Sequence, residues 1–223
     1  DLPGIYSLSP YSPEEVVSRN FILDSKPDCV INVIDGTNLE RNLYMTTQIM
    51  EMDVPVVIAI NMIDAVRKNG MDIDCKKLQE KLGIPVIAVS ALKRENLDDL
   101  MKAAIEASKT KREGTSILFG TENGEIIKEA KNIYETAGIE NPLFHAIKGL
   151  ENDEIEVSLH KEEAEKVKAL YKGSEDFESM SADQRYKYIT KELSDCKIGI
   201  GKEVKTAEKE KLSISDKIDK VLT

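Results

Sequence analysis

Residues 54–64 read Val-Pro-Val-Val-Ile-Ala-Ile-Asn-Met-Ile-Asp, an almost unbroken apolar run that ends in polar residues. Two similar runs, Cys29–Ile34 and Pro85–Val89, lie before and after it in the chain. Short continuous runs rich in β-branched residues are typical of strands buried on both faces. Helical patterns separate the three runs, and this alternation predicts a parallel α/β sheet with helices on both faces.

The helical patterns predict a change of architecture near residue 110. In the first part, helices are expected over Leu39–Met50, around residues 78–82 before Gly83, and from about Asn96 to Ala107. We therefore predict an α/β domain over residues 1–110 and a small all-helical domain over residues 111–223, with no further strand. The helices expected in the second domain are Gly124–Ala137, Pro142–Gly149, Lys161–Lys172, Ala182–Leu193 and Ser213–Leu222.

Composition excludes several functional classes. The 223 residues carry a formal net charge of −10, which disfavours nucleic acid as a partner because phosphate binding needs a basic surface. No apolar run approaches the roughly 20 residues of a membrane helix. The three cysteines are far apart and form no CxxC pair, which favours a reducing, cytosolic compartment. His145 and His160 have no partner motif in the sequence, and no chemical role is predicted for them.

Polar residues follow two of the three predicted strands. Asn61 and Asp64 come directly after the second run, and Ser90 and Ala91 follow the third. Ligands of open α/β sheets bind beyond the carboxyl ends of the strands. An aspartate there can accept two hydrogen bonds from the ring N–H and amino group of guanine, and the N–H of Ala91 can donate to the guanine carbonyl. The alternative is that these residues only form turns and helix caps.

The first four residues, Asp1-Leu2-Pro3-Gly4, suggest a further element. A carboxylate at a strand end can hold Mg²⁺ through water, and a glycine lets a backbone N–H approach a terminal phosphate. Alone, the motif reads equally as a Pro-Gly turn.

The order DxxG, NxxD, SA resembles the later G motifs of translation-factor-related GTPases. Residues 1–15 are similar to the third G motif and switch II of the ferrous iron transport protein B (FeoB) family, in which methionine commonly stands where Met62 does. In the second half, Ser181–Tyr186 resembles the ADxRY segment of the family's helical spacer. Ile214–Thr223 resembles the stretch that leads into the family's first membrane helix.

This resemblance implies the fold and the roles of individual residues. The sheet is expected to be part of a P-loop GTPase-type domain that binds GTP and GDP with Mg²⁺. Asp64 would recognise guanine, Asn61 would organise the loop, and Met62 would pack under the base. The remaining implied positions are Ser90, Ala91 and Leu92 at the base, Asp1 at Mg²⁺, Gly4 at the terminal phosphate, and Ile5, Tyr6 and Ser7 in the switch.

The resemblance also implies a biological setting. The intact protein would hydrolyse GTP at the cytoplasmic side of the cell membrane and regulate or drive ferrous iron uptake through its own membrane transport domain. Within this sequence there is no GxxxxGK[ST] phosphate loop and no switch I threonine. We therefore expect this chain alone to be inactive, because phosphate-loop contacts dominate phosphoryl transfer. The sheet edge left open is predicted to favour self-association.

Two alternatives stay open at this point. The chain could be a non-catalytic module that binds nucleotide or docks a partner through its helical domain. It could also be another translation-factor-related GTPase, such as a ribosome-assembly factor. Those proteins generally carry NKxD and often a basic RNA-binding appendage, and both Met62 and the acidic charge argue against this alternative.

Overall fold

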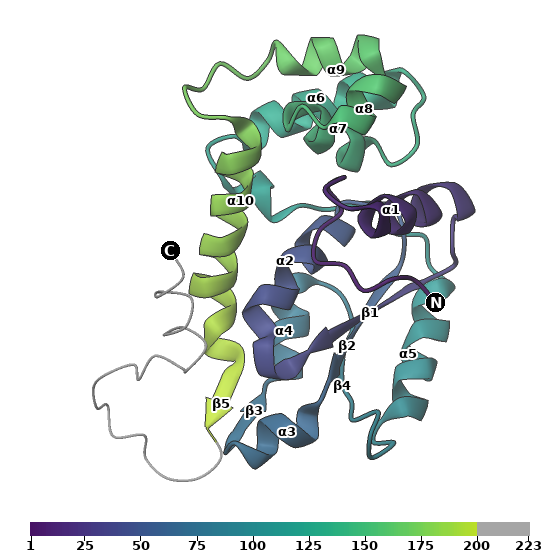
Figure 1. The fold of residues 1–223 in the computed structure, drawn as a ribbon, viewed down its shortest axis with the longest axis vertical. Coiled ribbons are helices and arrows are strands. Elements are labelled where there is room, and N and C mark those ends of the chain that lie inside the picture. The colour runs from purple at the N-terminus through teal and green to yellow at the C-terminus, as the bar shows by residue number, and fades with distance from the viewer. Residues whose placement is uncertain (200–223) are drawn as a thin grey trace.

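The computed structural model describes residues 1–199 and has a three-stranded parallel sheet at its centre (Figure 1). Its strands are β1 (Val30–Asp35), β2 (Val56–Asn61) and β4 (Val86–Ala88), in the order β1-β2-β4. Both pairings are parallel, with Ile60 of β2 opposite Ile34 on one side and Ala88 on the other. The predicted parallel sheet is confirmed, and its central strand is buried along Val56–Ile60 because helices cover both faces.

Two apolar clusters lie on opposite sides of this sheet. Helices α2 (Leu39–Ile49) and α4 (Cys75–Leu82) pack on the side of Val56, Ile58 and Ile60. Helix α5 (Leu97–Ser108) packs on the side of Val57 and Ala59. Side chains alternate between the two faces of a strand, so this single strand supplies both cores.

The sequence did not predict every helix. Helices α1 (Pro13–Ser25) and α3 (Ile63–Lys68) in the first half and α8 (Glu154–Leu159) in the second were missed. Ser12 caps α1 by accepting from the N–H of Glu15, with a proline at the first helical position. Short 3₁₀ turns lie at Gly36–Asn38, Ile117–Gly120 and Ser194–Cys196.

The second half forms its own apolar core. Helices α6 (Gly124–Thr136), α7 (Pro142–Leu150) and α9 (Lys161–Lys168) lie at one end of the molecule, and α10 (Phe177–Tyr188) runs from there along α2 (Figure 1). A π-helical turn, Ile189–Leu193, follows α10. The core residues of this half include Ile127, Tyr134, Leu143, Ile147 and Val167. The division near residue 110 stays a prediction, because α10 also packs on the first half.

The prediction that residues 111–223 are all-helical is wrong at one place. Lys197–Gly199 forms β5, which pairs antiparallel with β3 (Met71–Ile73) of the first half. A strand of three residues is too short to show a recognisable alternation of apolar and polar residues. The pairing of β5 with β3 also joins segments far apart in the chain, so the sequence contains no local sign of it. The predicted helix Ser213–Leu222 and the stretch Ile214–Thr223 lie outside the described residues.

Buried charges join the two halves. The guanidinium of Arg185 on α10 contacts both carboxylate oxygens of Glu51, which follows α2, at 2.8 and 2.9 Å. Lys148 of α7 pairs with Glu151 at 2.7 Å and donates to Ser9 Oγ at 3.0 Å. The four charged side chains are more than nine-tenths buried. Water cannot solvate them there, so each charge is stabilised by the opposite charge of its partner.

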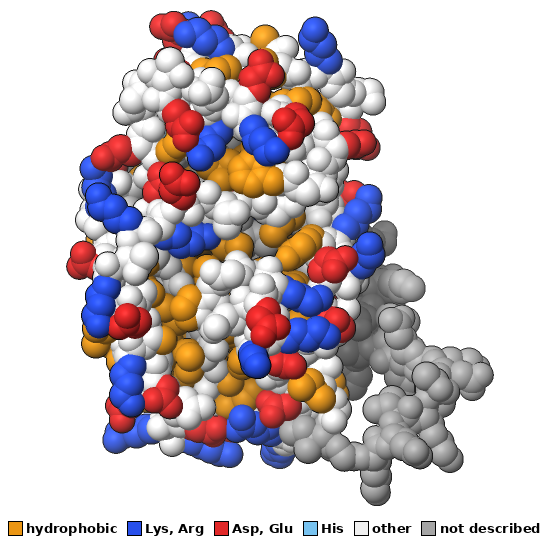
Figure 2. Space-filling model, turned by 180° about the vertical axis from the view of Figure 1, so that it is seen from behind, with side chains coloured by type: hydrophobic (Ala, Val, Ile, Leu, Met, Phe, Trp, Pro, Cys, Tyr) orange, Lys and Arg blue, Asp and Glu red, His pale blue; other side chains and the backbone are white. Residues whose placement is uncertain are grey.

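The outer surface is mixed in charge. On the face in Figure 2, basic and acidic side chains alternate between apolar patches, and that face offers no continuous positive surface. Among residues 1–199, none of the helices has both the length and the apolar character needed to cross a membrane.

Candidate functional site at the carboxyl edge of the sheet

The loops after β2 and β4 meet at the carboxyl edge of the sheet. The Ser90 hydroxyl donates to Asp64 Oδ1 at 2.8 Å, and the N–H of Ala91 donates to Asn61 Oδ1 at 3.0 Å. The backbone adds a third tie, from Ile63 N–H to the carbonyl of Val89 at 3.2 Å. The structure thus brings together the NxxD and SA motifs, which are about thirty residues apart in the sequence.

The backbone conformation of Met62 sets the direction of the loop after β2. Met62 adopts a left-handed conformation with φ of 63°, which turns the chain out of β2 directly into α3. Its side chain is 44% exposed at the site. Gly36, after β1, lies so close that a Cβ there would be 2.9 Å from Ile60 Cγ2 and 3.0 Å from the carbonyl oxygen of Asn61. A glycine at this position therefore lets the loops pack without displacing Asn61.

The electrostatics favour an ionised Asp64. The hydrogen bond from Ser90 lowers the pKa of the Asp64 carboxyl, and the positive charge of Lys93 lowers it further. The Lys93 ammonium is 4.0 Å from Oδ2, on an exposed side chain. Asp64 itself keeps 16% of its side-chain area in solvent. Each carboxylate oxygen has two lone pairs, so Asp64 can still accept hydrogen bonds from a ligand.

In this structure the N–H of Ala91, which the sequence predicts to donate to a guanine carbonyl, donates to Asn61. The role of Ala91 at the base stays a prediction. Ser90 also has a second contact, because its Oγ accepts from Lys93 N–H at 3.2 Å. Leu92 is 87% exposed at the tip of the same loop. In this structure Asn61, Ser90 and Ala91 hold the two loops together, and Asp64 stays partly exposed beside them.

Sequence reasoning missed Asp35, which ends β1 directly opposite Asn61. Its carboxylate accepts from Thr37 N–H at 2.8 Å and from Asn38 Nδ2 at 2.8 Å. Burial opposes ionisation, but these hydrogen bonds outweigh it and lower the pKa of Asp35. The sequence did contain the same signal that located Asn61 and Ser90, because a polar residue, Asp35, directly follows the predicted strand Cys29–Ile34.

The structure does not bring Asp1 and Gly4 to this cluster. Residues 1–5 line a groove of about 540 Å³ together with residues 29–33 in the first part of β1. The N-terminus is well separated from α3 in Figure 1. Of the predicted switch residues, Tyr6 lies under the guanidinium of Arg41 at 4.3 Å, and Ser7 Oγ donates to Gln48 Oε1 at 3.2 Å. Ile5 packs against the main core.

The residues present do not assemble a magnesium site. Asp1 is the only predicted ligand, and the described residues form no group of three or more possible metal ligands that includes it. Mg²⁺ demands a near-octahedral set of oxygens, and the described residues offer no such set around Asp1. We therefore assign Mg²⁺ no part in the chemistry proposed for this site.

Known proteins share this fold and sequence. The family model described as "Ferrous iron transport protein B" matches residues 1–104. A point mutant of S. thermophilus NFeoB bound to GDP is 35% identical with a TM-score of 0.81, over 88% of this chain and 79% of that chain. The chain belongs to the FeoB family. Its α/β sheet is that of a FeoB G domain.

Two further FeoB relatives extend the likeness. The cytosolic domain of the T. maritima FeoB iron transporter in its GMPPNP form has a TM-score of 0.77 at 30% identity, over 88% of this chain and 78% of that chain. The Fe(2+) transport protein A/Fe(2+) transporter FeoB fusion protein of Porphyromonas gingivalis is 34% identical over the whole chain. The chain spans 28% of that fusion protein and 34% of the 30%-identical Staphylococcus aureus Fe(2+) transporter FeoB.

Proposed function

We propose that this chain recognises guanine nucleotides through the loops after β2 and β4. The observation that carries the proposal is the pair of cross-loop hydrogen bonds, Ser90 to Asp64 and Ala91 to Asn61. They fix an ionised carboxylate at the ligand-binding edge of a parallel sheet. Solved relatives described as bound to GDP support guanine nucleotide as the ligand class.

Recognition rests on matching donors to acceptors. The two oxygens of Asp64 would accept from the ring N–H and the amino group of guanine, as charge-assisted hydrogen bonds. Adenine presents no donor pair in this arrangement, so the same carboxylate would be left unpaired against it. Asn61 and Ser90 act as positioning residues, and Met62 supplies an exposed apolar surface beside the base.

We further propose that the full-length protein hydrolyses GTP and regulates or drives ferrous iron uptake through a membrane transport domain. In that setting this chain lies on the cytoplasmic side of the membrane. The names of the relatives as Fe(2+) transporters support this setting. Self-association through the free edge of β1 remains part of the proposal, since β1 pairs on one side only within residues 1–199.

Titration calorimetry with GDP, GTP and ATP tests the proposal. The nucleotides are titrated into this chain and into a longer chain that carries a phosphate-loop segment ahead of Asp1. We expect the longer chain to bind both guanine nucleotides and to prefer GTP over ATP by at least about a hundredfold. Equal affinity for GTP and ATP in the longer chain would reject guanine recognition and favour the alternative, a module that docks a protein partner.

A further inference from the structure

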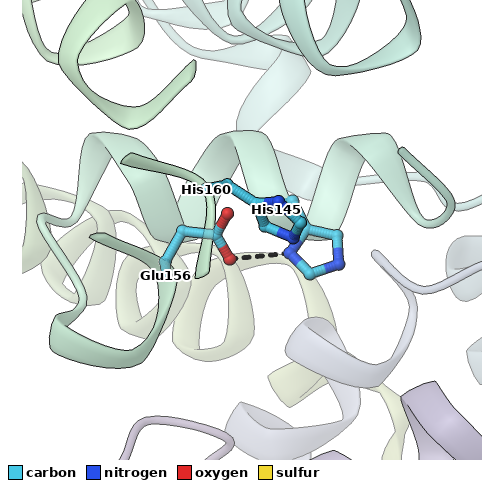
Figure 3. A group of neighbouring side chains, drawn as sticks. All are labelled: His145, Glu156 and His160. Atoms are coloured by element: carbon cyan, nitrogen blue, oxygen red, sulfur yellow. Dashed lines mark hydrogen bonds and ion pairs between the residues drawn. The ribbon is translucent and has the colours of Figure 1, made fainter. Parts of the chain in front are cut away.

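The only two histidines of the chain lie side by side in the helical half, contrary to their isolation in the sequence. Their ring centroids are 4.9 Å apart. His145 belongs to α7, Glu156 to α8, and His160 to the junction of α8 and α9. His145 Nδ1 is 2.6 Å from Glu156 Oε2, and one ligand atom from each of the three residues lies within 4.8 Å of the others. Figure 3 shows the three side chains converging from these elements.

The backbone positions the cluster from two sides. Glu156 and His160 are four residues apart, so one turn of α8 places them on the same face. Asp153 caps α8 by accepting from Glu156 N–H at 3.0 Å. The same Asp153 accepts from Arg19 Nη1 of α1 at 2.8 Å with both side chains buried. The helix that carries the carboxylate is therefore fixed independently of the histidines.

One carboxylate oxygen in the cluster has no partner. Glu156 is fully buried, yet its Oε1 has no hydrogen bond within the described part of the chain. Arg19 Nη2, 3.6 Å from the other oxygen, also has none. The Tyr134 hydroxyl makes no hydrogen bond within the described part of the chain either, and the Tyr134 ring stacks on that of His145 with centroids 6.0 Å apart. Buried unpaired polar atoms are costly, and their occurrence together points to a missing ligand.

We propose that His145, Glu156 and His160 bind a divalent first-row transition-metal ion. Two imidazoles and one carboxylate form a ligand set suited to Zn²⁺ and Fe²⁺, and they leave a position open for water. His145 is buried, whereas His160 is only partly buried, which gives the ion a route from solvent. This site is separate from the nucleotide site and does not depend on the proposed function.

Binding requires a small rearrangement of the three side chains. Metal–ligand bonds of about 2.0–2.2 Å place tetrahedral ligand atoms roughly 3.4 Å apart. The ion would therefore open the 2.6 Å contact of His145 with Glu156 and draw the more widely spaced groups inward. Arg19 can keep its ion pair with Asp153 throughout. The competing interpretation is a purely structural cluster, in which Glu156 serves only His145 and Arg19.

Metal titration of the full 223-residue chain distinguishes the two interpretations. Chelator-treated protein is titrated with Zn²⁺ by calorimetry and with Co²⁺ by visible absorption. We expect one equivalent of each ion to bind and the Co²⁺ complex to lack sulfur-to-metal charge transfer. His160→Gln and Glu156→Gln should each weaken Zn²⁺ binding at least about tenfold. Glu154→Gln, an exposed change on the same helix, is the matched control and should leave binding unchanged.

Circular dichroism and thermal unfolding establish that each variant is folded. Zn²⁺ should raise the Tm of the wild type and of Glu154→Gln but not that of His160→Gln. If Glu156→Gln fails to fold, Zn²⁺ binding by His160→Gln alone distinguishes the two interpretations. Binding weaker than millimolar in the wild type, or equal binding by folded His160→Gln, overturns the proposal. A thiolate charge-transfer band that disappears when the cysteines become serine would also overturn it, because the ion would then sit elsewhere.

Discussion

Asp64 illustrates how one side chain can be both anchored and available. One oxygen accepts from Ser90 at 2.8 Å, while the carboxylate as a whole keeps part of its surface in solvent. A mere turn residue would need only the first property. Because the ionised carboxylate is partly accessible to solvent, its role in base recognition can be tested by replacing one oxygen with an amide nitrogen.

We predict that Asp64→Asn switches base preference in a chain that carries the phosphate-loop segment. The new amide can still accept from Ser90 through its oxygen, but its NH₂ faces the donors of guanine. Charge-assisted hydrogen bonds contribute roughly 1.5–3 kcal/mol each, so GTP affinity should fall about tenfold or more. Xanthine has a carbonyl in place of the guanine amino group, so binding of xanthosine triphosphate should improve.

Competition titrations with the two nucleotides measure this switch. Asp98→Asn, an exposed change at the start of α5, serves as the control and should retain GTP preference. Asparagine caps helices nearly as well as aspartate. An unchanged preference for GTP in folded Asp64→Asn would therefore leave Asp64 with a structural role only.

At the scale of elements, α10 links the helical half to α2 on the sheet. Its Arg185 makes a paired contact with Glu51 and a further hydrogen bond to Thr47 of α2 at 3.1 Å. Its Ser181 donates to Glu151 at 2.8 Å. Fully buried ion pairs are costly to break, because the remaining charge has no solvent to replace its partner.

Replacing Arg185 with methionine should destabilise the protein strongly. The change leaves Glu51 buried without its counter-charge, and we expect a loss of about 3–5 kcal/mol in the free energy of unfolding. Lys187→Met on the same helix removes an exposed pair with Asp183 and should leave the free energy of unfolding nearly unchanged. Urea denaturation at neutral pH compares the two variants. Equal stability of both would mean that the Arg185 pair contributes nothing net.

At the scale of the whole molecule, Glu151 connects α7 with α10. Burial opposes its ionisation, but the charges of Lys148 and Arg185 outweigh burial and lower the pKa of Glu151 below its ordinary value of 4.5. An acid with a lowered folded-state pKa stabilises the fold above its unfolded-state pKa. That contribution is lost as pH falls through the folded-state value.

The stability deficit of Glu151→Gln should therefore depend on pH. We expect it to be largest near neutral pH and to shrink as pH falls below about 4.5, where the unfolded chain first takes up the proton, until the folded carboxyl is protonated at its lower pKa. Denaturation curves of both proteins between about pH 3 and about pH 7 give the difference directly. A deficit that stays constant across this range would show that packing, not charge, is what the glutamine disturbs.

The sequence alone determined the sheet and its ligand-binding edge. Continuous apolar runs such as Val54–Ile60 identify doubly buried strands, because each face must be covered. Short polar motifs directly after those runs located Asn61, Asp64 and Ser90, since parallel strands end at a common edge. Both patterns involve residues that are adjacent in the sequence, so they can be recognised without knowledge of the fold.

Only the tertiary structure decided which partners those residues have. The Ala91 N–H proved to be taken by Asn61, and β5 proved to pair with β3, because such contacts join distant segments. The two histidines appeared isolated until helices α7 and α8 packed together and brought Glu156 within reach of both. Asp1 and Gly4 match a motif in sequence but lie against the start of β1. Spacing along a chain constrains neighbours within one element, whereas contacts between elements depend on how the whole chain packs.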